Sequence, residues 1–340
     1  MAYNFRNLVF EGGGVKGIAY LGVLEILSEK GIIDQIQRVG GTSAGAINAI
    51  LLGLGFTLDE TTRILWGLDF TKFMDDSWGL VQDTARLIEQ YGWYKGDFFR
   101  DWIGKLIKEK TGNSEATFAD IEALKKKRKF KSLYFMGTNL STRFSEVFSA
   151  EHTPRWCVAD AVRISMSVPL FFAAKRSLRG DVYVDGGVID NYPIKLFDRD
   201  KYVTAENYSI PNYYKSINSE LSDRDREISK YVYNKQTLGF RLDAKDEISL
   251  FRDQAEPPHS KIEGFFDYTW ALIETVLNVQ ESAHLHGDDW ARTVYINTLG
   301  VKTTEFGLRD DKKQALVQAG RDGITEYFKW YDNPDVKPNK

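Results

Sequence analysis

The chain contains very little cysteine and histidine. Its 340 residues include one cysteine, Cys157, and four histidines that are scattered along the sequence. A single cysteine cannot close an intramolecular disulfide, and histidines without nearby cysteines do not have the spacing of a structural zinc site. We therefore expect a protein of a reducing compartment that holds no structural metal.

Long apolar runs and a strong net charge are missing as well. No run approaches the roughly 18 apolar residues of a membrane span, and the sequence opens without a basic and then apolar leader. The formal net charge is −3, which argues against a nucleic-acid-binding surface spread over the molecule. We expect a cytoplasmic protein that binds no nucleic acid and whose basic contacts are local.

The first 55 residues alternate between strand-like and helix-like segments. Residues 7–11 predict a strand, which runs into a glycine loop and then a helix that ends near residue 30. Residues 33–39 predict a second strand, and residues 46–54 a second helix. This order is typical of a parallel sheet covered by helices on both faces.

The rest of the chain fits one large domain over residues 1–340, with its motifs in residues 7–195. Residues 58–111 indicate an aromatic-rich helical region, and residues 200–265 are polar and form a lid, an insertion or an exposed helical flank. The strands expected after residue 111 are 131–139, 143–149, 181–185 and 293–297. The helices expected there are 158–166, 264–287 and 311–330, so that residues 266–340 complete the domain as helix, strand and helix.

A nucleophilic serine is predicted at Ser43. It lies in the G-x-S-x-G pentapeptide formed by Gly41, Thr42, Ser43, Ala44 and Gly45, between the second strand and the second helix. A strand-to-helix turn this sharp is the context of a nucleophile elbow, and the two glycines remove side chains that would collide with the strand and helix. The alternative is an ordinary helix N-cap.

The glycine loop after the first strand supplies backbone amides for a negative charge. Its residues are Gly12, Gly13, Gly14, Val15, Lys16 and Gly17. The G-x-G-x-x-G spacing also matches a dinucleotide fingerprint, in which the second strand ends in an acidic residue that binds ribose. Here that strand ends in the serine elbow, so an oxyanion hole fits better than a nucleotide site. Close packing of a helix on a strand is the plain structural alternative.

A carboxylate at the end of another strand is the candidate base. Asp185 follows the short alternating strand 181–185 and precedes Gly186 and Gly187. No histidine has an obvious acidic partner in a strand-to-loop context, so a Ser-His-Asp triad is poorly supported. A carboxylate bonded to the hydroxyl can serve as base if burial raises its proton affinity, which makes Ser43 and Asp185 a sufficient dyad. A turn aspartate before glycines is the alternative.

Three motifs in this order resemble the patatin-like phospholipases: G-G-G-x-[RK]-G at residues 12–17, G-x-S-x-G at 41–45 and D-G-[AG] at 185–187. The stretch 164–172 looks like the family's serine- and proline-containing segment. Lys16 stands where arginine is more usual, and Gly187 where alanine is frequent. The resemblance implies a three-layer α/β/α fold with a mostly parallel central sheet. It also implies a Ser43–Asp185 dyad, an oxyanion hole of loop amides around Gly13, Gly14 and Val15, no metal or cofactor, and hydrolysis of fatty-acyl esters in phospholipids.

Other functions stay open at this stage. One is a nucleotide-binding enzyme that uses the glycine loop, and another is a lipid-binding or regulatory protein whose dyad works only when a partner or ligand activates it. Residues 91–110 pair aromatic and basic side chains as interfacial helices do, yet their apolar residues recur at the spacing of a core-facing helix. The basic run 125–129 either attracts anionic lipid at the inner membrane surface or forms a solvated turn.

Overall fold

The computed structural model describes residues 3–73, 90–243, 287–303 and 305–333, together with residues 262–264, 268, 271–272, 275 and 335. The helix expected over 264–287 falls mostly on residues outside this set, as does the end of the polar segment 200–265. Among the described residues, no helix is both long enough and apolar enough to span a bilayer.

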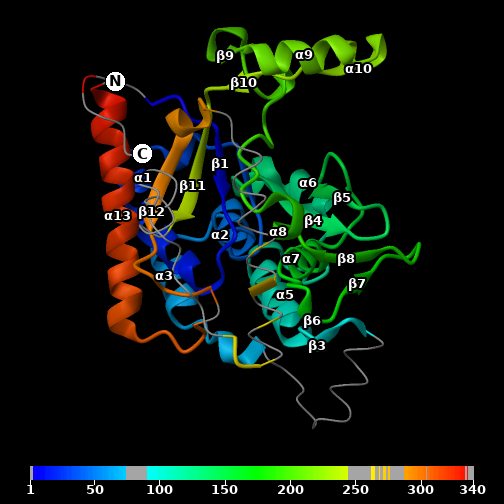
Figure 1. Ribbon diagram of the computed structural model, residues 1–340, viewed down its shortest axis with the longest axis vertical. Coiled ribbons are helices and arrows are strands. Elements are labelled where there is room, and N and C mark those ends of the chain that lie inside the picture. Colours follow the sequence, from blue (N-terminus) through cyan, green and yellow to red (C-terminus); the bar gives the residue numbers. More distant parts are fainter. Residues whose placement is uncertain are drawn as a thin grey trace.

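Figure 1 gives the arrangement of the helices and strands. The strands are β1 (Asn7–Phe10), β2 (Arg38–Gly41), β3 (Gly92–Tyr94), β4 (Ser132–Asn139), β5 (Phe144–Ser149), β6 (Leu170–Phe172), β7 (Lys175–Arg176), β8 (Val182–Asp185), β9 (Tyr208–Ser209), β10 (Tyr233–Asn234), β11 (Thr237–Asp243) and β12 (Thr293–Asn297). The α-helices are α1 (Tyr20–Glu29), α2 (Ala44–Gly53), α3 (Leu58–Trp66), α5 (Asp97–Thr111), α6 (Phe118–Arg128), α7 (Val158–Ser165), α8 (Gly187–Asp190), α9 (Asn212–Glu220), α10 (Asp223–Ile228) and α13 (Asp310–Asp332). The 3-10 turns include η1 (Gly14–Ala19), η2 (Ile33–Gln35), η3 (Phe70–Phe73) and η6 (Asp289–Arg292).

One large sheet organises the molecule. Its strands lie in the order β12-β11-β1-β2-β4-β8-β7, with β5 paired to β4. The pairs from β12 to β4 are all parallel, whereas β5, β7 and β8 run antiparallel to their partners. The sheet is therefore mostly parallel, as the alternation of the first 55 residues predicts.

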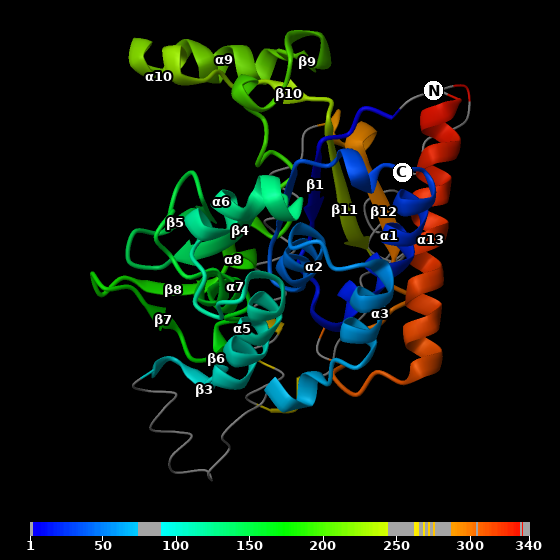
Figure 2. The ribbon, with the colours of Figure 1, turned by 180° about the vertical axis from the view of Figure 1, so that it is seen from behind.

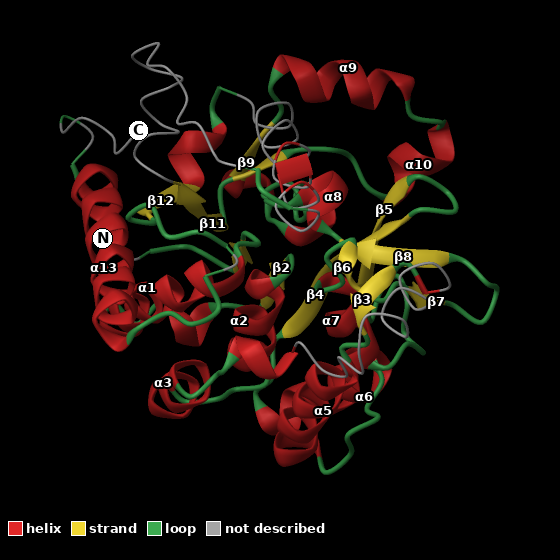
Figure 3. Cartoon of the chain, turned by 60° about the horizontal axis from the view of Figure 1, so that its bottom comes forward, coloured by secondary structure: helices red, strands yellow, loops and turns green. Residues whose placement is uncertain are grey.

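Both faces of this sheet are covered, as Figure 3 shows from below. Leu8 and Phe10 of β1 join the large apolar core that α1, α2, α7 and α13 complete. Val9 points to the opposite face, where it packs with Ile194 and Phe197 of the segment that follows α8. Every residue of β1 is buried for this reason, and the α/β fold expected from the sequence is confirmed.

Several of the expected elements differ from the sequence prediction. The second strand begins at Arg38 rather than residue 33, because its partner β1 is only four residues long and Arg38 pairs with Asn7; residues 33–35 form the turn η2. The region 58–111, expected to be helical, contains the strand β3, which pairs with β6 in a small separate sheet. A three-residue strand of this kind gains its stability from a partner that is distant in the sequence.

The aromatic and basic segment 91–110 is mainly a core helix. α5 begins at Asp97, and its Phe99, Ile103 and Ile107 are buried in the large core, whereas Phe98 is exposed. The basic run 125–129 forms the last turn of α6 and the residue after it, directly before the amino end of β4.

Within the polar segment 200–265, residues 200–236 form an arm that contains β9, α9, α10 and β10. Residues 237–243, expected to belong to a lid, insertion or exposed flank, instead form β11, a mostly buried strand that pairs with β1 and β12 in the main sheet. Figures 1 and 2 show this arm at the top, beyond the end at which β1 and β11 begin. The residue Asn4, which precedes β1, is bonded to Asn207 of the arm. Because Ser43 follows the opposite, carboxyl end of β2, residues 200–236 do not lie over it; residues 244–261 are outside the described set.

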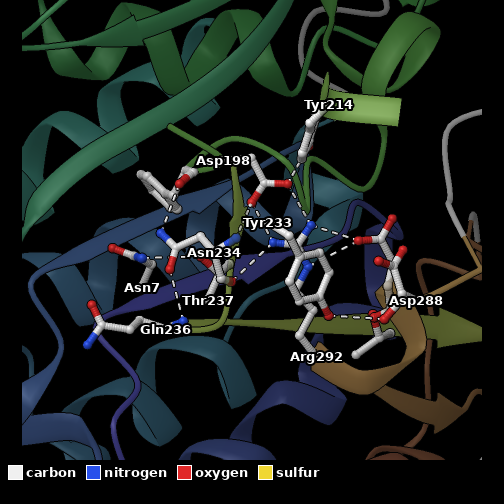
Figure 4. Close-up of polar contacts among 12 residues, drawn as sticks. Asn7, Asp198, Tyr214, Tyr233, Asn234, Gln236, Thr237, Asp288 and Arg292 are labelled. Carbon is white, nitrogen blue, oxygen red and sulfur yellow. Dashed lines mark hydrogen bonds and ion pairs between the residues drawn. The ribbon is translucent and has the colours of Figure 1, made fainter. Parts of the chain in front are cut away.

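A buried ion cluster ties the arm to the sheet (Figure 4). The Asp198 carboxylate accepts hydrogen bonds from two Arg292 nitrogens, the Tyr214 hydroxyl and the Asn234 amide, and Arg292 also donates to Asp289. Asp198, Arg292 and Asp289 are each at most 2% exposed. Nothing in the sequence pattern indicates this cluster, because Asp198, Asn234 and Arg292 lie far apart along the chain.

Candidate active site

The strands that carry Ser43 and Asp185 approach each other along the same side of β4. On β4, Phe135 pairs with Gly41 of β2, and Gly137 pairs with Asp185 of β8. Since β5 occupies the other side of β4 along both positions, β2 and β8 share one side. They run in opposite directions, so that their ends meet roughly 7 Å apart along β4.

Ser43 lies on a sharp turn between β2 and α2. Its φ of 53° and ψ of −126° are a strained conformation for a residue with a side chain. A Cβ added to Gly41 would lie 2.5 Å from the carbonyl carbon of Gly45, and one added to Gly45 would lie 2.3 Å from the carbonyl oxygen of Phe10. Only glycine fits at these two positions, which is the physical content of the G-x-S-x-G pattern.

The surroundings of Ser43 hold its backbone and leave its hydroxyl with a weak contact. The Ser43 amide donates to the Ser165 hydroxyl at 3.0 Å, and its hydroxyl lies 3.6 Å from the Met166 sulfur. The neighbouring Thr42 hydroxyl donates to the carbonyl of Asp190 at 2.9 Å. The turn is thus bonded to the chain on either side of Asp185.

Asp185 is buried and only half satisfied. Its Oδ1 accepts the Gly187 amide at 2.7 Å, whereas its Oδ2 has no hydrogen-bond partner among the described residues. Burial raises the pKa of Asp185 to about 7, against the opposing effects of the Gly187 amide and the Ser43 hydroxyl. The effect of the Ser43 hydroxyl identifies the two groups as neighbours, and a carboxylate with a free lone pair can accept a proton near neutral pH.

The glycine loop lies beside Ser43. A Cβ added to Gly12 would lie 3.0 Å from the Ser43 Cβ. Three loop amides already have acceptors: Gly12 donates to Asn191, Val15 to Thr303 and Lys16 to Gly13. Among the described residues the amides of Gly13 and Gly14 have none. These two amides, rather than that of Val15, remain available to a bound anion.

Residues that sequence reasoning missed position this site. The Asp185 amide donates to the carbonyl of Ser167 at 2.8 Å. The Ser167 hydroxyl in turn receives a hydrogen bond from Arg163, whose guanidinium is buried and also donates to the carbonyls of Gly96 and Ala173. The weak serine-containing motif at 164–172 was the only signal for this support. Gly186, which lies between Asp185 and Gly187, packs against the carbonyl of Met136.

A cavity of about 310 Å³ adjoins the glycine loop and the start of α2. Gly14, Val15, Gly17 and Ala44 line it on that side. The opposite wall comes from α3, η3, the segment before α13 and α13 itself. It contains the charged residues Asp69 and Lys313 and the apolar side chains of Leu65, Trp66, Leu68, Phe70, Phe306 and Leu308. Asn48 also lines the cavity, and its Oδ1 has no partner among the described residues.

The sequence model described as patatin-like phospholipase matches residues 8–198, which contain the glycine loop, the elbow and Asp185. The chain belongs to the patatin-like phospholipase family. Membership of this family supports a lipid-cleaving hydrolase activity for the domain.

Three relatives show how far this similarity extends. Protein YqhO of Bacillus subtilis is 28% identical over 92% of this chain and 94% of its own length. Protein R571 of Acanthamoeba polyphaga mimivirus is 35% identical over 57% of this chain. The probable lipid hydrolase 463L of Invertebrate iridescent virus 6 is 26% identical over 56%. The matches span 62% and 63% of the two viral proteins, so that more than a third of each lies outside the alignment.

A solved structure agrees with the fold. The crystal structure of VipD from Legionella pneumophila superimposes with a TM-score of 0.61 at 19% identity, covering 96% of this chain and 67% of VipD. At this identity the likeness extends to the patatin-like fold alone.

Proposed function

We propose that this patatin-like protein is a serine acyl hydrolase that cleaves fatty-acyl esters of phospholipids or related lipids through a Ser43–Asp185 dyad. The observation that carries the proposal is the pair itself. A strained serine stands beside a buried carboxylate that has one unpartnered oxygen and a pKa raised to about 7. Neither a helix cap nor a turn aspartate requires this combination.

In the first half of the reaction, the Ser43 Oγ attacks the ester carbonyl carbon while its proton moves to Asp185 Oδ2. The carbonyl oxygen becomes an oxyanion, which the amides of Gly13 and Gly14 bind; each good donor is worth roughly 3 kcal/mol in such a site. The intermediate collapses, the bond to the alkoxy oxygen breaks, and that oxygen takes the proton from Asp185. The alcohol leaves and an acyl-enzyme remains on Ser43.

In the second half, a water molecule attacks the acyl-enzyme and gives its proton to Asp185. The intermediate expels the Ser43 oxygen, which takes the proton back, and the fatty acid is released. One carboxylate therefore acts as base and then as acid in each half. No metal or cofactor takes part in any of these steps.

The group of apolar side chains in the cavity next to the glycine loop supports a long acyl chain as substrate. Because Ala44, which follows Ser43, and Gly14 of the glycine loop both line the cavity, a chain in the cavity starts close to the reacting carbonyl. With a single cysteine in the chain, the proposal places the enzyme in the cytoplasm.

The test is covalent labelling with a long-chain fluorophosphonate, read by intact mass and peptide mapping. We expect one adduct on Ser43 in the parent protein and none in Ser43→Ala. The control is Ser216→Ala on the arm, which should label like the parent. An adduct on another residue, or full labelling of Ser43→Ala, would refute the proposal; nucleotide binding and activation by a partner would then be the functions to test.

A further inference from the structure

Several large apolar side chains are exposed together at two loop tips. Leu178, in the turn between β7 and β8, is fully exposed, and Phe144, at the start of β5, is 73% exposed. Leu140 and Tyr91, on the neighbouring segments, are each nearly half exposed. Single exposed apolar residues are ordinary, whereas several on neighbouring segments indicate an interaction surface.

These tips are ordered turns rather than loose loops. The Ser177 hydroxyl accepts the amides of Arg179 and Asp181, which holds Leu178 at the apex. The two tips are also joined to each other, since the Leu140 amide donates to the carbonyl of Val182 at 2.9 Å and the Val182 amide to the Ser141 hydroxyl. The fold thus presents the apolar side chains to solvent in a fixed arrangement.

Basic residues surround the apolar group. Segments 140–146 and 175–182 contain Arg143, Lys175, Arg176 and Arg179 against two carboxylates, Glu146 and Asp181. Glu146 is engaged by the Tyr183 hydroxyl at 2.8 Å, and Arg176 lies over the Tyr91 ring and donates to its hydroxyl. This local excess of positive charge contrasts with the net charge of −3 of the whole chain.

The surface lies at the same end of β4 as the candidate active site. β4 runs directly into residues 140–144, and β8 leads from the other tip to Asp185, seven residues after Leu178 and so at most about 23 Å away. Figures 1 and 2 show both tips projecting to the same side. The basic run 125–129 lies instead at the amino end of β4.

We propose that residues 140–144 and 176–180, with Tyr91, form a tip surface that docks on an anionic phospholipid bilayer. Leu178 and Phe144 enter the boundary between headgroups and acyl chains, and the arginines contact anionic headgroups, as in other interfacial proteins. A bilayer is favoured over a protein partner because the proposed function, on which this inference rests, takes its substrate from such a surface.

Sedimentation with vesicles tests the tip surface in the full-length protein. We would use Ser43→Ala as the background, so that the vesicles are not consumed, with vesicles of phosphatidylcholine alone or with about one third phosphatidylglycerol. A second readout is turnover of a short, soluble ester by the same tip variants with Ser43 intact.

For the apolar contribution, Leu178→Ser with Phe144→Ser should weaken partitioning to anionic vesicles about tenfold or more. The matched control is Ile217→Ser, an exposed apolar residue on α9 at the opposite edge, which should bind like the parent. Turnover of the soluble ester should stay unchanged in both.

For the charge contribution, Arg143→Gln with Arg179→Gln should weaken binding to anionic vesicles about 25-fold at low salt, at roughly fivefold per arginine. Binding to phosphatidylcholine should not change. The control Lys126→Gln with Lys127→Gln removes two charges from α6 and should have no effect.

Parent-like sedimentation of both tip variants would overturn the tip surface. The proposal would also be overturned if the tip variants lost self-association but kept vesicle binding. The tips would then contact a second copy of the chain. If the proposed function is wrong instead, the protein still binds vesicles through the tips but neither labels at Ser43 nor cleaves the soluble ester.

Discussion

Asp185 and Asp198 are both buried aspartates at opposite edges of one sheet, and their surroundings differ in one respect. Asp198 accepts four hydrogen bonds, two of them from a guanidinium. Asp185 accepts one, from the Gly187 amide, and its second oxygen has no partner among the described residues. Asp198 is thus fully paired, whereas Asp185 keeps an oxygen that can take up a proton.

A structural buried carboxylate and a reactive one differ in how completely their oxygens are hydrogen-bonded. A buried carboxylate that is fully paired ties segments together, here the arm and the sheet. A buried carboxylate left partly unpaired costs free energy, and such groups are retained where chemistry uses them. Exchanging each aspartate for asparagine should therefore have opposite effects on activity and stability.

The largest expected effect is the loss of activity in Asp185→Asn. An amide cannot accept the serine proton, so kcat/KM for a soluble ester should fall by about 10²–10⁴-fold. The control is Asp181→Asn, directly before β8, which should retain activity. If Asp185→Asn turns over at the parent rate, another residue is the base, and the contrast between the two aspartates has no catalytic meaning.

The next effect is the loss of stability in Asp198→Asn. Removing the charge leaves Arg292 buried with a weakened partner, which should lower the free energy of unfolding by about 3–5 kcal/mol. Urea unfolding measures this, and kcat/KM of the folded fraction should equal that of the parent. A small change in stability together with a large loss of activity would mean that Asp198 serves catalysis rather than structure.

A further effect, present only at the higher pH values, is a pH-dependent stabilisation by Asp185→Asn. The pKa of Asp185 is raised from 3.8 to about 7 in the folded protein, so that the parent loses stability as pH rises between these values. At 1.36 kcal/mol per pH unit, the loss is of order 4 kcal/mol above pH 7. The asparagine variant lacks this loss, and its advantage in urea unfolding should grow from pH 4 to pH 7 and then level off. A constant difference across that range would mean that Asp185 has an ordinary pKa.

The sequence predicted the local motifs and the α/β alternation well, because each depends on residues close together in the chain. The G-x-S-x-G turn needs glycines at Gly41 and Gly45 for steric reasons that act within five residues. The start of β2 was wrong and β3 and β11 were missed, since a strand's extent depends on a distant partner. The support of Asp185 by Ser167 and Arg163 was missed for the same reason.

The residue types alone determined which groups could do the chemistry: one serine on a tight turn, one aspartate before two glycines, and a glycine-rich loop. Tertiary structure decided that these groups meet. β2 and β8 share one side of β4 and run toward each other, which brings residues 43 and 185 together. It also decided that the polar arm lies beyond the amino ends of β1 and β11, and that the apolar tips lie at the carboxyl end of β4. Such placements follow from strand pairing over a hundred or more residues, and burial then sets the pKa of Asp185, which no local pattern of residues specifies.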